Sequence, residues 1–142
     1  MIRILIVDDH EHIRGMIRAL LEAEKGWQVC GEAADGRAGI DQCVLLEPNL
    51  VILDIHVPVR NGLEAAREII LLFPGMLILL LAMDGSPHFA LAVMACGAQG
   101  LLVKARASED LVSAVSALLR GERYFPNDST ASTPKSKSKA AA

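Results

Sequence analysis

The sequence predicts an α/β fold in which five parallel strands form one sheet with helices on both faces. Strand-like and helix-like segments alternate five times along the 142 residues, which is the pattern of repeated βα units. Crossovers between parallel strands are right-handed and place helices over both faces of the sheet. The length suits one domain that can bury a sizeable core.

The composition is that of a globular protein, with 52% hydrophobic and 22% charged residues. A net charge of -3 argues against non-specific binding of nucleic acid by this chain alone. Cys30, Cys43 and Cys96 share no metal-ligand spacing, so we expect buried, reduced thiols in a cytoplasmic protein. The N-terminus lacks signal-peptide anatomy, and no apolar run approaches the roughly 20 residues of a membrane span.

The first two βα units are predicted within residues 2–46. An apolar strand pattern over residues 2–7 precedes a helix whose apolar positions recur every three or four residues between Ile13 and Leu21. A second strand is predicted over residues 27–31. Asp35 and Gly36 then form a turn before a helix that runs to Leu46.

The remaining units follow the same alternation. A third strand ends at Asp54, residues 56–62 form a loop, and a third helix covers residues 63–72. The fourth strand, residues 76–82, is wholly apolar, as expected for a strand covered on both faces. Helix four begins with Ser86 as its N-cap and Pro87 in its first turn.

The last unit is predicted from a strand over residues 100–103 and a helix that ends at Gly121. Ser108 is the expected N-cap, with Glu109 and Asp110 in the positive first turn. From residue 126 to 142 the composition shifts to Ser, Thr, Lys, Ala and Pro, which predicts a disordered tail after a domain of residues 1–125.

Five such strands fit the flavodoxin-like order 2-1-3-4-5. In that order strands one and three are neighbours, so Asp8, Asp9 and Asp54 meet at the carboxyl edge of the sheet, where open α/β sheets bind ligands. Lys104 follows the edge strand, and its long side chain can partly span the distance. Three carboxylates invite a divalent cation, and a lysine suits a phosphoryl group.

This cluster indicates phosphoryl transfer to Asp54. A carboxylate can attack phosphorus and form an acyl phosphate, while Mg²⁺ held by Asp8, Asp9 and Asp54 would screen the repulsion between anions. Lys104 would contact another phosphoryl oxygen. Each acid taken singly is more simply a helix cap or a solvated side chain, but the combination at matching strand ends favours a functional site.

The histidines raise a second interpretation, a transition-metal site of Asp and His ligands. His10 and His56 lie in strand-to-helix loops, which favours exposed, unligated imidazoles. His56 could still overhang the pocket and restrict water. His12 and His88 are expected on the solvated surface. The sequence has no Gly-Lys-Ser/Thr phosphate-binding loop.

Several motifs resemble the response-regulator receiver domain of two-component signalling over residues 1 to about 125. They are Ile-Leu-Ile-Val-Asp8-Asp9-His10, Val51-Ile52-Leu53-Asp54-Ile55-His56-Val57-Pro58, Asn61-Gly62-Leu63 and Gly97-Ala98-Gln99-Gly100-Leu101-Leu102-Val103-Lys104. Residues 31–36 and 121–124 resemble the NarL/FixJ subfamily in particular. The resemblance implies a CheY-like form of the predicted fold.

The resemblance also implies a set of residue roles. Asp54 would accept a phosphoryl group from a histidine kinase or phosphotransfer protein, and Lys104 would contact that group. Asp8, Asp9 and Asp54 would bind Mg²⁺ together with the backbone carbonyl of His56. The expected activity is self-phosphotransfer and slow self-dephosphorylation in a phosphorelay, not turnover of a free substrate.

Two positions depart from the family pattern. The family usually has Thr or Ser where this chain has Ala82, and Tyr or Phe where it has Leu101; these positions normally form the switch. Alanine has no donor for the phosphoryl group, and such a charge-assisted bond contributes about 1.5–3 kcal/mol. We therefore expect weak or altered switching.

Partners and output are less defined by the sequence. Residues 89–94 are apolar almost all round the fourth helix, which indicates a homodimer or partner surface, although tight packing of small residues explains the pattern equally well. The helix-turn-helix that usually follows in NarL/FixJ proteins is missing, so the chain is either a stand-alone receiver or part of a truncated DNA-binding regulator.

Two other classes of function stay open. A Mg²⁺-dependent phosphatase with an aspartyl-phosphate intermediate would want an acid or base two residues beyond Asp54, where His56 is a weak candidate. A pseudo-receiver would use the fold as an interaction module without phosphorylation. Ala82 and Leu101 favour the pseudo-receiver, whereas the intact acids and Lys104 oppose it.

Overall fold

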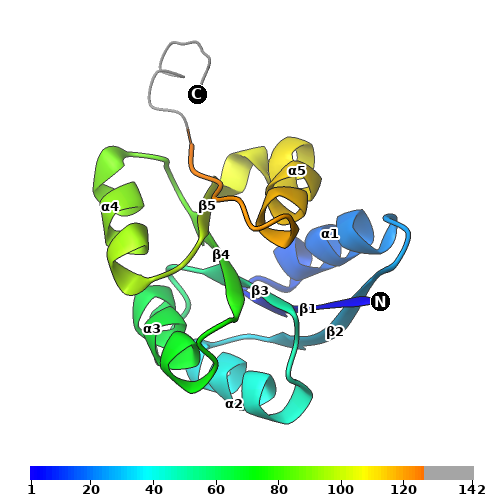
Figure 1. Cartoon of the computed structure of the whole chain (residues 1–142), viewed down its shortest axis with the longest axis horizontal. Coiled ribbons are helices and arrows are strands. Elements are labelled where there is room, and N and C mark those ends of the chain that lie inside the picture. The colour runs from blue at the N-terminus through cyan, green and yellow to red at the C-terminus, as the bar shows by residue number, and fades with distance from the viewer. Residues whose placement is uncertain (127–142) are drawn as a thin grey trace.

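A computed structural model describes residues 1–126 and contains one five-stranded parallel sheet (Figure 1). The strands lie in the order β2-β1-β3-β4-β5, as predicted. They are β1 (Ile2–Val7), β2 (Trp27–Ala33), β3 (Leu50–Asp54), β4 (Leu77–Ala82) and β5 (Gly100–Val103). The reversal of strand order between β1 and β3 creates the ligand-binding position expected at the carboxyl edge of the sheet.

Helices cover both faces of the sheet (Figure 1). On one face lie α1 (Glu11–Glu22) and α5 (Ala107–Leu119); on the other lie α2 (Gly36–Leu46), α3 (Gly62–Leu72) and α4 (Pro87–Cys96). A 3₁₀ helix, η1 (Lys104–Arg106), joins β5 to α5. In the described part of the chain, no helix is long and apolar enough to span a membrane.

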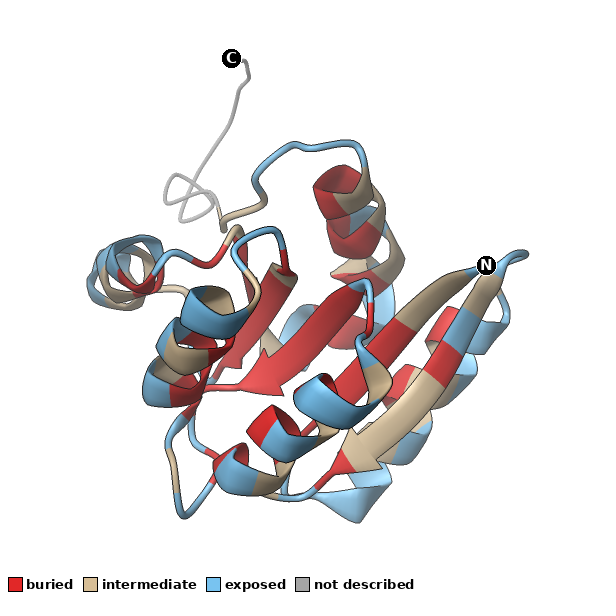
Figure 2. Ribbon diagram, turned by 60° about the horizontal axis from the view of Figure 1, so that its bottom comes forward, coloured by how far each residue is buried: buried red, intermediate tan, exposed pale blue. Residues whose placement is uncertain are grey.

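The core consists of two aliphatic layers, one on each face of the sheet. Successive side chains of a strand point to opposite faces, so Leu5 and Val7 pack towards α2 and α3 while Ile4 and Ile6 pack towards α1 and α5. Every residue of β3 is buried (Figure 2). A strand covered on both faces needs a continuous apolar sequence, which explains the run that ends in Asp54.

One predicted helix start differs from the structure, and another is confirmed without the expected capping bond. Ser108 was expected to cap α5, but η1 leads directly into the helix at Ala107, so Ser108 lies inside the first turn and Arg106 is the N-cap. The acidic first turn was predicted correctly, and Asp110 pairs with Arg106 at 3.0 Å. Ser86 does occupy the N-cap of α4, but its side chain makes no capping hydrogen bond.

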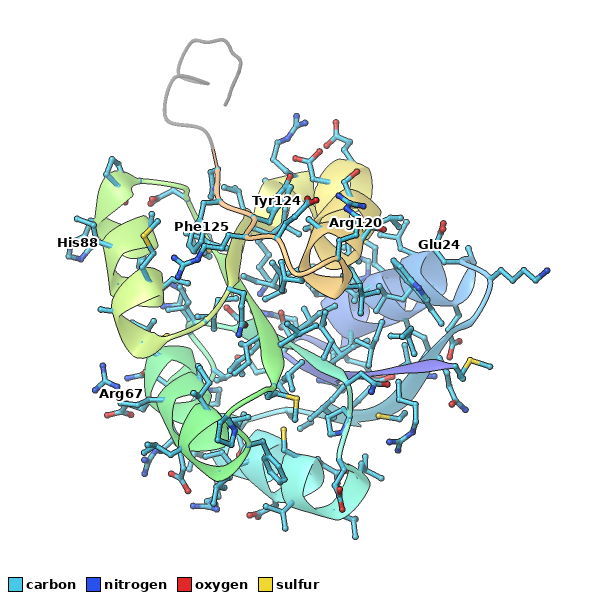
Figure 3. All side chains as sticks on the ribbon, in the orientation of Figure 1. Glu24, Arg67, His88, Arg120, Tyr124 and Phe125 are labelled. Carbon is cyan, nitrogen blue, oxygen red and sulfur yellow. The ribbon has the colours of Figure 1, made fainter. Side chains whose placement is uncertain are left out.

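The described chain ends with a segment that covers the outer edge of β5. Tyr124 forms a parallel bridge with Gly100: its carbonyl accepts a hydrogen bond from the Leu101 N–H at 2.8 Å, and its N–H donates to the Gln99 carbonyl at 3.1 Å. Figure 3 shows Tyr124 and Phe125 on this segment, beside α5. An edge covered in this way cannot pair with another strand. All but the first residue of the predicted tail, 126–142, lies outside the described residues.

Candidate functional site

The carboxyl ends of three strands bring the predicted acids and lysine together. Val7 and Leu53 are paired across β1 and β3, so Asp8 and Asp54 lie at the same edge. Their relative exposures are 0% and 2%, and they are the only buried charged residues in the described chain. Asp9, one residue beyond Asp8, is exposed. Two buried carboxylates close together would repel strongly without a cation.

Lys104 supplies one positive charge to this pair. Its Nζ atom lies 2.9 Å from Asp8 Oδ2 and 3.0 Å from Asp54 Oδ2. Burial alone would lower the pKa of Lys104, but its hydrogen bonds and attraction to Asp8 and Asp54 outweigh burial and raise that pKa. The ammonium therefore stays charged, and the lysine reaches across β4 to the other end of the cluster.

Backbone donors fix the orientation of both buried carboxylates. The N–H of His10 donates to Asp8 Oδ1 at 2.8 Å, and the N–H of His56 donates to Asp54 Oδ1 at 3.1 Å. Each bond spans two residues, the local turn that aspartate favours after a strand. Because each Oδ1 is held by its own loop, each Oδ2 faces Lys104.

The cluster fits a divalent cation. Ligand atoms of Asp8, Asp9, His10 and Asp54 all lie within 4.8 Å of one another. Asp8 Oδ2 is buried, and within the described chain it meets only the Lys104 ammonium, at 2.9 Å, which Asp54 shares. One ammonium leaves two of the three carboxylate charges uncompensated, and oxygen-rich sites of this charge suit Mg²⁺.

His10 is exposed, as predicted, but its ring turns towards the acids. Its Nδ1 lies 3.1 Å from Asp8 Oδ1, 3.2 Å from Asp9 Oδ1 and 3.3 Å from Lys104 Nζ. The turn closed by the His10 N–H folds the loop back, so the ring reaches the acids that precede it in the sequence. The run Asp8-Asp9-His10 was the signal for this arrangement.

The other histidines lie outside the cluster. His56 is exposed, and its ring meets Phe89 of α4 edge-on with centroids 6.0 Å apart. His12 and His88 are exposed, as predicted, and Figure 3 shows His88 on the outer side of α4. The ring of His56 therefore contacts α4, while its backbone N–H donates a hydrogen bond to Asp54.

Close backbone packing holds the loop that contains His56. The Gly62 N–H donates to the Ile55 carbonyl at 2.8 Å, and a Cβ at Gly62 would overlap the Asp54 carbonyl. A Cβ at Gly36, the first residue of α2, would overlap the carbonyl of Arg60. Glycine is needed at both positions because no side chain fits. The sequence marked these glycines as turn residues but did not reveal the contact between α2 and the loop.

Ala82 and Leu101, the two positions that depart from the family pattern, are fully buried. Both belong to the apolar cluster against which Phe89 and Phe125 pack. The Ala82 methyl group offers no hydrogen-bond donor, and the next residue, Met83, exposes 68% of its surface. Phe125 belongs to the segment beside β5, so an aromatic ring from outside the sheet packs against the cluster that contains Ala82 and Leu101.

Comparison with known proteins defines the class of this fold and site. Residues 4–116 match the family model described as the response regulator receiver domain. The chain therefore belongs to the response regulator receiver domain family of two-component signal transduction. Receiver domains are regulators rather than enzymes that turn over a free substrate.

Relatives place the chain near the LuxR/FixJ-type regulators. It is 37% identical to the response regulator UvrY of Escherichia coli over 128 residues, 90% of this chain and 59% of UvrY. It is 32% identical to the response regulator GacA of Pseudomonas aeruginosa over 125 residues, 88% of this chain and 58% of GacA. The chain thus spans less than two thirds of either relative.

Solved structures agree with the fold. A LuxR-family two-component response regulator from Aurantimonas shares 34% identity with a TM-score of 0.84, over 89% of this chain and 90% of that one. The non-phosphorylated receiver domain of the stress response regulator RcsB from Escherichia coli shares 29% identity with a TM-score of 0.83, over 89% of this chain and 98% of that one.

Proposed function

We propose that Asp54 accepts a phosphoryl group from a histidine kinase or phosphotransfer protein, within a receiver of residues 1–125. The observation that carries this proposal is the pair of buried carboxylates, Asp8 and Asp54, joined through Lys104. Phosphoryl transfer requires mainly positioning and charge neutralisation. A buried nucleophilic carboxylate beside a fixed ammonium provides both.

Each residue has a role in this proposal. A carboxylate oxygen of Asp54 attacks phosphorus and forms an acyl-phosphate bond, while the P–N bond breaks and its electron pair stays with the imidazole of the donor. Lys104 contacts a phosphoryl oxygen. The His56 N–H keeps Asp54 oriented. Slow attack by water later releases phosphate and restores the carboxylate.

The metal site of this proposal is formed by Asp8, Asp9, Asp54 and the backbone carbonyl of His56. A bound Mg²⁺ would neutralise negative charge between the carboxylates and the phosphoryl group. The buried Asp8 Oδ2 supports this assignment, because the one ammonium beside it is shared with Asp54 and leaves negative charge that a second cation would balance.

We also propose altered switching and an output through protein contacts. Ala82 offers no hydroxyl to the phosphoryl group, and Leu101 replaces the usual aromatic residue. Leu91 and Met94 expose 67% and 42% of their surface on α4, which supports a partner or homodimer surface there. This chain spans only 52% of the transcriptional regulatory protein DegU of Brevibacillus brevis, which is 29% identical to it over 124 residues. The receiver of a truncated DNA-binding transcriptional regulator is therefore the alternative setting.

A cytoplasmic location belongs to the same proposal. Cys43 and Cys96 are buried and Cys30 is half-buried, and all three are free thiols. Burial, with a smaller contribution from Cys30, raises the pKa of Cys43 to about 12, so this thiol is inert. Such thiols suit a reducing compartment.

The second candidate function is a pseudo-receiver that acts without phosphorylation. The absence of a donor at Ala82 favours it, because the phosphorylated state would lack a contact that draws the following loop inward. The buried carboxylate pair and Lys104 favour phosphorylation instead. The two functions differ in whether Asp54 can be modified.

The test is chemical phosphorylation followed by intact-mass measurement. The protein is incubated with acetyl phosphate, with Mg²⁺ or with a chelator, beside an Asp54→Asn variant. We expect one labile phosphoryl adduct in the parent protein with Mg²⁺ and none in the variant. Equal labelling of both proteins would overturn the assignment of Asp54, and no adduct in either would favour the pseudo-receiver.

A further inference from the structure

The imidazole of His10 lies among the acids of the candidate metal site. We propose that His10 supplies a nitrogen ligand there, so that the site binds transition-metal ions through one nitrogen and the carboxylates of Asp8, Asp9 and Asp54. This inference rests on the proposed pocket but goes beyond it, because the proposed Mg²⁺ site uses oxygen ligands alone.

The spacing of the donor atoms fits direct coordination. A metal ion with bonds of about 2.1 Å holds neighbouring ligand atoms about 3.0 Å apart and opposite ones about 4.2 Å apart. His10 Nδ1 lies 3.1 Å from Asp8 Oδ1 and 3.2 Å from Asp9 Oδ1, which are distances for neighbouring ligands. The whole set, with Asp54, falls within 4.8 Å.

The orientation of the His10 ring also fits a ligand. Its Nδ1 lies within 3.3 Å of Asp8 Oδ1, Asp9 Oδ1 and Lys104 Nζ, so this ring nitrogen already faces the proposed site. The His10 side chain is 61% exposed, whereas its backbone is pinned by the bond from its N–H to Asp8. The imidazole ring can therefore adjust its position by small rotations while the backbone of His10 stays beside the acids.

The charge around the buried Asp8 oxygen also supports a cation. Asp8 Oδ2 meets only the Lys104 ammonium within the described chain, and that ammonium is shared with Asp54. A second cation would compensate the remaining negative charge. A site of three carboxylates and one imidazole offers hard oxygen donors for Mg²⁺ and a borderline nitrogen donor that favours Ni²⁺, Co²⁺ and Zn²⁺.

The position of His10 predicts a metal-selective effect of mutation. In His10→Asn the amide oxygen still suits a hard cation but replaces the nitrogen donor that Ni²⁺ prefers. His12→Asn is the matched control, because His12 is exposed in the first turn of α1 and lies outside the cluster. Calorimetric titration of the full chain with NiCl₂ and with MgCl₂ compares the three proteins.

We expect His10→Asn to weaken Ni²⁺ binding about 10-fold or more, a loss of affinity comparable to that of mutations at other metal sites. Its Mg²⁺ binding should change less than about twofold. His12→Asn should match the parent protein for both ions. Equal loss of both ions, or unchanged Ni²⁺ affinity in His10→Asn, would overturn the inference.

A spectroscopic readout tests the bond itself. Pulsed EPR of the Mn²⁺-loaded parent protein, with histidine labelled by ¹⁵N, should show nitrogen coupling that disappears in His10→Asn and persists in His12→Asn. Absence of that coupling in the parent would overturn nitrogen ligation.

Mg²⁺-dependent labelling of the same samples with acetyl phosphate separates this inference from the proposed function. Phosphoryl labelling without nitrogen coupling would overturn only the assignment of His10 as a ligand. Nitrogen coupling without phosphoryl labelling would support the metal site and contradict the proposed phosphotransfer.

Discussion

Charge balance at single residues explains much of the architecture of the site. Lys104 keeps its charge beside Asp8 and Asp54, and together they form a compact buried cluster. A similar arrangement braces the start of the fold: Glu32 on β2 accepts hydrogen bonds from Arg14 and Arg18 of α1, at 2.9 and 2.7 Å. Arg14 also donates to the Asp8 carbonyl at 2.7 Å, so this brace touches the backbone of the site.

Glu32 should make stability depend on pH. Burial acts to raise its pKa, but the hydrogen bonds and attraction from Arg18 and Arg14 outweigh it and lower the pKa below 4.5. Its contribution is therefore present above about pH 4.5 and is lost as pH falls through the lowered value. We expect Glu32→Gln to lower the free energy of unfolding by about 1 kcal/mol at pH 7, with a smaller difference below pH 4.

Urea denaturation at both pH values measures this difference. Glu24→Gln is the control, because the Glu24 carboxylate makes no ion pair within the described chain. A Glu32→Gln effect that stays constant between pH 7 and pH 3.5 would show that the ion pairs are not its source.

Ala82 allows a direct test of altered switching. Ala82→Ser adds one hydroxyl at the end of β4, where a phosphoryl group on Asp54 could accept its hydrogen bond. Such a bond contributes about 1.5–3 kcal/mol to the phosphorylated state. We expect phosphorylation to slow hydrogen exchange in residues 83–90 more strongly in Ala82→Ser than in the parent protein.

Leu81→Val is the control for the Ala82 experiment, because it alters the same strand without adding a donor. Equal protection of residues 83–90 in Ala82→Ser and the parent protein would show that the missing hydroxyl is not what limits the switch.

At the scale of elements, the start of α2 and the loop after β3 form one packed unit. Gly36→Ala would drive a methyl group into the Arg60 carbonyl, and we expect it to lower the free energy of unfolding by about 1–3 kcal/mol. Gly15→Ala is the matched control. Gly15 lies on the exposed face of α1, and no atom outside the backbone of that helix lies within 4 Å of a Cβ there, so alanine should stabilise the helix by about 0.5–1 kcal/mol.

Thermal and urea unfolding of the two alanine variants provide the comparison. Stabilisation by Gly36→Ala would mean that the loop after β3 moves freely away from α2. In that case the loop could not hold His56 and Asp54 in the observed arrangement.

The elements themselves were largely predictable, because apolar runs and helix periodicity reflect local packing. The runs that form β1, β3 and β5 end where the sequence indicated, and the strand order followed from the βα alternation. The start of α5 was not predictable, because η1 depends on how Lys104 is drawn back towards the acids. The cover of the β5 edge by Tyr124 was also missed, since residues after a terminal helix carry little periodic signal.

At the scale of the whole molecule, the clustering of the acids with Lys104 could be predicted, because parallel topology determines which strand ends lie at the same edge of the sheet. The exposure of His10 was predicted, but the contact of its ring with Asp8 and Asp9 was not, because the direction of an exposed ring depends on a local turn that periodicity does not describe. The structure therefore places an imidazole beside carboxylates that the sequence had already grouped. The contact of His56 with Phe89 likewise required coordinates, since it joins two loops from different βα units.

The most direct measurement is the position of the phosphoryl group in the labelled protein. Borohydride reduces an aspartyl phosphate to homoserine, so peptide sequencing by mass spectrometry after reduction identifies the modified residue. The proposed function predicts homoserine at position 54 alone, and only in samples treated with acetyl phosphate and Mg²⁺. Homoserine at position 8 or 9, or at no position, would contradict it.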